Sequence, residues 1–243
     1  MTREEVIADL GTIARSGTQA FLAGLKQEGT PPELIGQFGV GFYSAFMVAE
    51  SVSLVTRPAG TDAPATRWES AGVDEFTVTD DPFPGPGTQI VLKPKPDCRD
   101  YLEEWKLREI VGRYCDFIAH PIRLKSSTGS DSSKEWPVIN SRQAIWRRPP
   151  EEVSETDHEN FFQHLAHAGG KPLRHLHYVA EGATCFRALL YLPAEAPFEL
   201  FLPAPDRHGL HLYVRRMFIC DDCPELLPGY LRFVKGVVEA DDL

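Results

Sequence analysis

The first residues of the chain follow a pattern of polar and hydrophobic positions that predicts a helix. Thr2 and Glu5 have the spacing of a capping box, in which the side chain of each accepts a hydrogen bond from the backbone N–H of the other. Hydrophobic residues then recur every three or four positions and would share one buried face: Val6, Ile7, Leu10, Ile13 and Ala14. Because Gly11 and the Ser-Gly-Thr run at 16–18 interrupt this pattern, we expect the helix to be short or broken.

Short hydrophobic runs and one longer amphipathic segment follow in the first half of the chain. Runs at 52–56, 75–79 and 88–92 are separated by Pro- and Gly-rich turns, and they predict strands. A helix is predicted at 19–27. A longer amphipathic helix is predicted at 100–118, because several hydrophobic residues fall on one side of it: Leu107, Ile110, Val111, Tyr114 and Phe117.

Small polar residues replace the hydrophobic pattern after residue 125. This run begins Ser-Ser-Thr-Gly-Ser-Asp, which indicates a short linker at 126–143 between domains at 1–125 and 144–243. The second half has its own alternation of patterns, which predicts helices at 154–167 and 224–238 and strands at 175–180, 183–192 and 210–219. Since helices and strands are mixed in both halves, the predicted fold class is α+β in two domains.

The amino-acid composition disfavours two classes of binding partner, nucleic acids and membranes. The formal net charge of −10 disfavours a nucleic-acid partner held by phosphate contacts, although it leaves a local basic patch possible. No stretch has the length and apolar character of a membrane span. The five cysteines are few for 243 residues and odd in number, which indicates reduced thiols. We therefore expect a cytoplasmic protein with neither nucleic-acid nor membrane partners.

The glycine-rich segment before residue 42 is the strongest candidate for ligand chemistry. Gly36, Gly39 and Gly41 precede a helical stretch, and glycines at such a place let the backbone N–H groups approach an anion. The spacing alone also fits a tight turn between a helix and a sheet. The Walker lysine pattern is absent, and no hydrophobic strand leads into the loop as in a dinucleotide fold. An anion cradle and a plain turn both remain open at this point.

Other candidate groups have simpler interpretations. Cys220 and Cys223 have redox or zinc-ligand spacing, but no second pair complements them, so we interpret them as two unrelated thiols. Histidines at 164, 167, 175 and 177 lack a carboxylate or thiol at ligand spacing, and no metal site is predicted. The aromatic run at 198–201 fits either an exposed interaction surface or core packing. No catalytic residue is predicted, since Ser44 has no recognisable partners.

Several longer motifs occur in an order and spacing that resemble the heat-shock protein 90 family. In the first half they are LGTIARSGT at 10–18, IGQFGVGFYSAF at 35–46, WES at 68–70 and GT at 87–88. In the second half they are AIW at 144–146, APFELF at 196–201, LYVRRMFI at 212–219 and YLRFVKGVV at 230–238. Because no long charged linker is present, the chain is most similar to the bacterial type and to the mitochondrial branch.

The resemblance implies a fold and a set of ligand-binding residues. The first domain would be part of a nucleotide-binding α/β sandwich with the histidine-kinase-like ATPase fold, and the second would begin the family's α/β middle domain. The cofactor would be ATP with magnesium. Arg15, Ser16, Gly17 and Thr18 would belong to a lid, and Asp9 stands where many relatives have asparagine. Residues that would contact ATP are Gly36, Gln37, Phe38, Gly39, Val40, Gly41 and Phe42 at the phosphates and Thr88 near the adenine.

The resemblance also implies an ATP-dependent chaperone that folds client proteins in the intact molecule. The family's glutamate base, its magnesium-linked asparagine and its adenine-binding aspartate would precede residue 1, and an arginine loop and dimerisation domain would follow residue 243. We therefore expect an internal fragment that binds ATP weakly, lacks ATPase activity and lacks the homodimer contact. A non-enzymatic module that retains the client surface is the alternative. A sensor histidine kinase is disfavoured, because kinases have no counterpart to residues 212–219.

Overall fold

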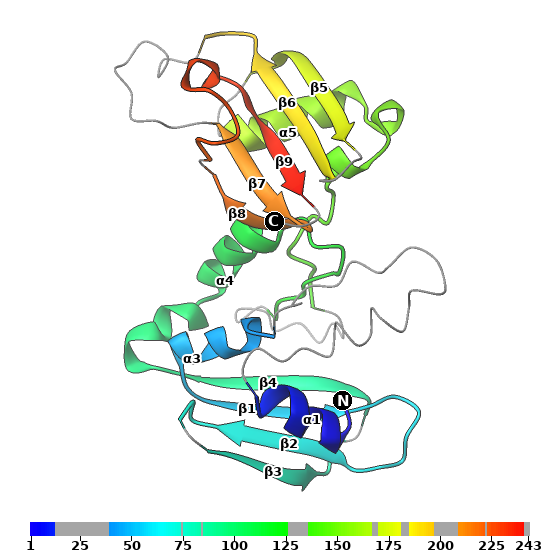
Figure 1. Cartoon of the computed structure of the whole chain (residues 1–243), viewed down its shortest axis with the longest axis vertical. Coiled ribbons are helices and arrows are strands. Elements are labelled where there is room, and N and C mark those ends of the chain that lie inside the picture. The colour runs from blue at the N-terminus through cyan, green and yellow to red at the C-terminus, as the bar shows by residue number, and fades with distance from the viewer. Residues whose placement is uncertain are drawn as a thin grey trace. The chain divides into compact units, whose positions relative to one another are not determined.

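The chain forms two compact units, Met1–Glu103 and Glu104–Leu243, in a computed structural model (Figure 1). The structure describes residues 1–12, 39–73, 75–83, 85–125, 136–166, 170–180, 185–196, 209–221 and 223–240. Each unit combines helices with one β-sheet, which confirms the predicted α+β class. The linker predicted at 126–143 falls within the second unit, and part of it lies outside the described residues.

The first unit is a four-stranded antiparallel sheet with short helices against it (Figure 1). Its strand order is β3-β2-β1-β4, so β3 and β4 form the edges. The strands are β1 (Ala49–Arg57), β2 (Ala65–Ser70), β3 (Phe76–Asp81) and β4 (Gly87–Pro94). The helices are α1 (Arg3–Leu10), the 3-10 helix η1 (Gly41–Ser44), α3 (Ala45–Val48) and the 3-10 helix η2 (Pro96–Leu102).

Helix α1 begins and ends as its sequence predicts. Both hydrogen bonds of the capping box form: the Glu5 backbone N–H donates to the Thr2 hydroxyl at 3.2 Å, and the Thr2 N–H donates to the Glu5 carboxylate at 2.7 Å. The helix stops at Leu10, and Gly11 caps it. One turn of α1 is thus anchored to the core through Val6, which is fully buried.

A single face of the first sheet carries the core of this unit. The buried residues are Val6, Ala49, Val52, Leu54 and Trp68, and partly buried residues pack against them from the N-terminal segment and from the η1–α3 turn. Val52 and Leu54 point to the same face of β1 because side chains alternate along a strand, and Trp68 lies opposite Leu54 on β2. Strand β2 had no sequence prediction, since its letters ATRWES do not alternate cleanly.

The second unit is a mixed five-stranded sheet in the order β5-β6-β9-β7-β8, and Figure 1 shows α5 beside it. Only the β7–β9 pair is parallel among the described pairs. Strands are β5 (Pro172–Ala180), β6 (Phe186–Pro193), β7 (Leu210–Val214), β8 (Met217–Cys220) and β9 (Lys235–Ala240). Helical elements are α4 (Glu104–Ile110), the π-type turn η3 (Val111–Cys115), η4 (Ile145–Arg147), η5 (Pro150–Glu152), α5 (Glu155–Ala166) and η7 (Gly229–Leu231).

An aromatic cluster forms the core of the second unit. Trp146 is fully buried and contacts Phe117 edge-on, with ring centroids 4.7 Å apart. Phe161 from α5 and Tyr213 from β7 complete the packing around it. Edge-to-face aromatic pairs stabilise a core beyond the area that they bury. The Trp146 motif at the entry to this domain is therefore a structural anchor.

Three secondary-structure predictions differ from the structure. The strand predicted at 210–219 is two strands, because Arg215 and Arg216 adopt positive φ angles of 48° and 66° and turn the chain back on itself. The helix predicted at 224–238 is wrong: the segment holds turns and the three-residue η7, and its end is β9, which lies between β6 and β7. The helix predicted at 100–118 is divided into η2, α4 and η3. The helix predicted at 19–27 lies outside the described residues.

Candidate functional site

The described part of the glycine loop is a tight turn that leads into η1. Gly39 has a φ angle of 64°, a left-handed conformation that favours glycine. Gly41 begins η1, and a Cβ built on it would meet no atom of the described residues within 4 Å. Among the described residues, no side chain caps the start of this turn. The backbone at Gly41 is thus open to an approaching group, and a bulkier residue there would occupy that space.

Two aromatic residues attach this turn to the rest of the first unit. The Phe42 ring packs edge-on against Trp68, with centroids 5.5 Å apart. The Tyr43 hydroxyl donates a hydrogen bond of 2.9 Å to the backbone carbonyl of Leu10 at the end of α1. Burial raises the pKa of the Tyr43 phenol, which keeps it a donor at neutral pH. The glycine turn is therefore held against both the sheet core and the end of α1.

Thr88 lies on β4 and faces the same side of the sheet as the glycine turn. It pairs with Thr56 of β1, and the two hydroxyl oxygens are 2.8 Å apart. Thr56 is fully buried and also accepts a 3.0 Å hydrogen bond from the Met1 amino group. Because Thr56 shares its strand face with Leu54, Thr88 projects toward the side that Phe42 covers.

The sheet surface beside Thr88 on β4 is apolar and exposed to solvent. Ile90 and Leu92 follow Thr88 at alternate positions and therefore share its face. Ile90 is 50% exposed and Leu92 is 42% exposed, whereas their partners on β1, Leu54 and Val52, are buried. Sequence reasoning did not select these two residues. The signal was the alternation Thr-x-Ile-x-Leu in a strand that already held a candidate.

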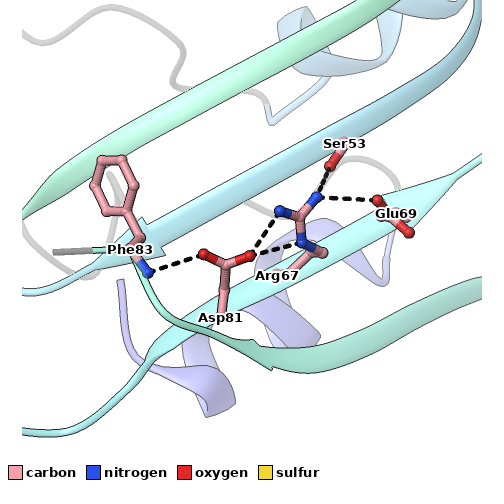
Figure 2. A network of polar contacts seen from close by, with 5 residues as sticks. All are labelled: Ser53, Arg67, Glu69, Asp81 and Phe83. Carbon is pink, nitrogen blue, oxygen red and sulfur yellow. Dashed lines mark hydrogen bonds and ion pairs between the residues drawn. The ribbon is translucent and has the colours of Figure 1, made fainter.

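The opposite face of the first sheet carries a polar network that joins three strands (Figure 2). Arg67 donates to Asp81 at 2.8 Å, to Ser53 at 3.0 Å and to Glu69 at 3.2 Å, and the Phe83 backbone N–H donates to Asp81 at 2.9 Å. The hydrogen bond with Asp81 is the main cause of a raised Arg67 pKa. Since the guanidinium is paired with its neighbours, this network is part of the sheet and is no candidate site.

The structure brings together only part of the predicted ligand set. Gly39, Val40, Gly41 and Phe42 form the turn, and Thr88 lies on the same face of the sheet. The remaining members lie outside the described residues: Arg15, Ser16, Gly17, Gly36, Gln37 and Phe38. The aromatic run at 198–201 lies outside them as well.

The structure also shows what surrounds the histidines and the other possible metal ligands named from the sequence. Within the described residues there is no group of three or more His, Cys, Asp or Glu side chains arranged to hold a metal ion. His175 stacks on His158 with ring centroids 3.8 Å apart, and His177 Nε2 lies 2.9 Å from the Trp146 carbonyl. No helix in the described ranges is both long enough and apolar enough to cross a membrane.

Comparison with known proteins assigns a family to this arrangement. The family model described as Hsp90 protein matches residues 125–243. The chaperone protein HtpG of Geobacter sulfurreducens is 49% identical over 261 aligned residues, which cover 100% of this chain and 40% of that protein. The chain belongs to the heat-shock protein 90 family.

Other members of the heat-shock protein 90 family show the same relation. HtpG of Salinispora arenicola is 49% identical over 255 residues, and HtpG of Mycobacterium tuberculosis is 46% identical over 265 residues. Each alignment covers 100% of this chain and 40% of the relative. The chain thus spans about 40% of the length of these curated relatives. The family assignment confirms the resemblance carried by the motifs in both halves.

Proposed function

We propose that this chain is part of an ATP-dependent molecular chaperone that assists the folding of client proteins. The observation that carries the proposal is the placement of an open glycine turn and of Thr88 on one face of the first sheet. Family membership supports it, because the curated relatives reported above are named chaperone proteins. We also propose domains at 1–125 and 144–243, the first with the histidine-kinase-like ATPase fold.

The residues present fit the two ends of a nucleotide. The open space at Gly41 and the left-handed turn at Gly39 suit the close approach of phosphate oxygens to backbone N–H groups. Thr88 offers a hydroxyl, and the Ile90 and Leu92 side chains offer an apolar floor for a planar base. The proposed site also includes the lid residues Arg15 to Gly17 and the loop residues Gly36 to Phe38, which lie outside the described ranges. They are included only because their sequence motifs resemble those of the family. Magnesium would be held together with the phosphates.

An apolar sheet face in the second unit suits contact with unfolded clients. Leu176 and Tyr178 on β5 are 57% and 50% exposed, and Leu192 on β6 is exposed beside them. These residues lie opposite the α5 face, because His175 at the alternate position of β5 stacks on His158 of α5. Exposed apolar patches on a soluble protein commonly mark interaction sites. We therefore assign client contact to this face, which includes an edge strand.

The proposal is tested in a chimera. This chain replaces the aligned segment of the Geobacter sulfurreducens relative, and ATP hydrolysis is measured with and without Gly41→Ala. Gly85→Ala is the matched control, since a Cβ there also meets no atom of the described residues within 4 Å. We expect the Gly41 variant to lose about tenfold or more in ATP hydrolysis, in line with lost oxyanion contacts, and the Gly85 variant to match the parent chimera. Equal hydrolysis by both variants would exclude the Gly41 turn as the phosphate site.

The client surface is tested on the 243-residue chain by light scattering from a heat-denatured model enzyme. Leu176→Lys combined with Tyr178→Ser should reduce the suppression of aggregation, while Val91→Ser on β4 of the first unit, a similarly exposed apolar position, should leave it unchanged. Suppression by the chain together with a chimera that hydrolyses no ATP would favour the non-enzymatic interaction module instead. Unchanged suppression in the double variant would refute the assigned surface.

A further inference from the structure

Two cysteines that are separated by two residues meet in the second unit. Cys220 ends β8, and Cys223 lies in the turn that follows. Their sulfur atoms are 3.2 Å apart, and both side chains are only partly buried. The Leu226 backbone N–H donates to the Cys223 carbonyl at 3.1 Å, which defines the turn on the far side of the pair. The two thiols, interpreted as unrelated from sequence, are thus in direct contact.

We propose that Cys220 and Cys223 form a redox-active dithiol that closes reversibly to a disulfide. A disulfide bond is about 2.05 Å long, so the sulfurs need to approach by roughly 1 Å, which rotation of the two cysteine side chains can supply. Both thiols are accessible to a small oxidant because neither is fully buried. None of the five cysteines of the chain is joined in a disulfide in the structure.

The oxidant that we assign is a peroxide, and the reaction balances with it. The thiolate of one cysteine attacks a peroxide oxygen, the O–O bond breaks, and a sulfenic acid and a hydroxide ion form. The second thiolate then attacks the sulfenic sulfur, the S–O bond breaks, and a second hydroxide leaves. The two thiol protons convert both hydroxides to water. The two sulfurs lose two electrons in total, and a cellular dithiol reverses the change by exchange.

The segment between the two cysteines also contains Asp221, whose carboxylate lines a neighbouring cleft. Asp221, directly after Cys220, pairs with Arg113 at 3.2 Å, and the Arg113 guanidinium lies over the Tyr114 and Phe218 rings. Asp221 and Arg113 both line a cleft of about 420 Å³ in the second unit. Asp221 lies between the two cysteines in the chain, so disulfide formation would shift its carboxylate. Oxidation would therefore change where this negative charge lies in the cleft.

The test uses the whole 243-residue chain in its reduced form. The chain is exposed to stoichiometric hydrogen peroxide, its remaining thiols are alkylated, and peptides are mapped by mass before and after reduction. We expect an intramolecular disulfide within the 220–223 peptide, a loss of about 2 Da, and full recovery with a dithiol. Cys98, Cys115 and Cys185 should stay alkylatable, which makes them internal controls that require no variant.

Two variants distinguish a reactive pair of thiols from a single reactive thiol. Cys223→Ser should convert Cys220 oxidation into a sulfenic or sulfinic product, whereas Cys185→Ser should leave the disulfide yield unchanged. The proposal is overturned by disulfides between chains, by over-oxidation of Cys220 in the parent chain, or by an absence of reaction at both positions. Stoichiometric zinc that protects the pair from alkylation until a chelator is added would overturn it as well, in favour of a metal site.

Discussion

Replacement of Glu239 by glutamine tests the buried centre of the second unit. Glu239 lies on β9 and is fully buried, and its carboxylate accepts at least four hydrogen bonds. The Trp146 indole N–H and Arg147 Nε each donate at 2.6 Å, Arg147 Nη2 donates at 2.8 Å, and the Arg216 backbone N–H donates at 2.5 Å. One side chain therefore joins the domain-entry motif, the β7–β8 turn and the central strand.

The expected cost follows from this geometry. A glutamine keeps the shape of Glu239, but its amide oxygen accepts only part of the four bonds, and its NH2 group faces donors. Arg147, whose side chain is 12% exposed, also loses its counter-charge. Breaking a buried ion pair by removing one partner costs about 3–5 kcal/mol of folding stability. By contrast, an exposed pair such as Lys171–Glu159 contributes less than about 1 kcal/mol.

The assay is urea unfolding of the parent chain, Glu239→Gln and the control Glu159→Gln, followed by tryptophan fluorescence. Hydrogen exchange in the β9 peptide assigns the change to the second unit. Glu239→Gln should lower the unfolding midpoint far more than Glu159→Gln does. If the variant does not fold, Arg147→Met combined with Glu239→Gln should be less destabilised, because it removes the buried cation that has lost its counter-charge while the amide oxygen still accepts hydrogen bonds. Equal midpoints for the two glutamine variants would refute the reasoning.

Two further predictions concern the same unit. Gly236→Ala should cost about 1–3 kcal/mol by overpacking, since its Cβ would stand 2.5 Å from the Leu189 carbonyl oxygen, whereas Gly229→Ala, with open space, should be nearly neutral in thermal unfolding. Burial and then the neighbouring His175 lower the pKa of His158 below its ordinary 6.5, so the unfolded chain binds the proton more readily and stability falls as the pH drops through about 6.5. His158→Gln should flatten the dependence of the melting temperature on pH, and an unchanged slope would contradict this role.

Local patterns were sufficient wherever the structure depends on neighbours in the chain. Thr2, Glu5 and Gly11 specify the start and end of α1 through backbone hydrogen bonds that close within one turn. The motifs in both halves were sufficient for the family, because several long strings in fixed order occur together far less often than one glycine loop. The turn at Gly39 was recognisable for the same local reason, since its φ angle of 64° favours glycine.

Tertiary contacts decided the rest. Residues 235–240 form a strand because β6 and β7 supply backbone partners on both sides, an interaction that no window around them contains. Thr88, Ile90 and Leu92 share a face with the glycine turn only because β4 pairs with β1 in one register. Cys220 and Cys223 have a spacing that fits many structures, and the turn after β8 selected the one in which their sulfurs touch. Sequence alone determined the family, the fold class and the ends of α1, whereas pairing register and packing determined which distant side chains meet.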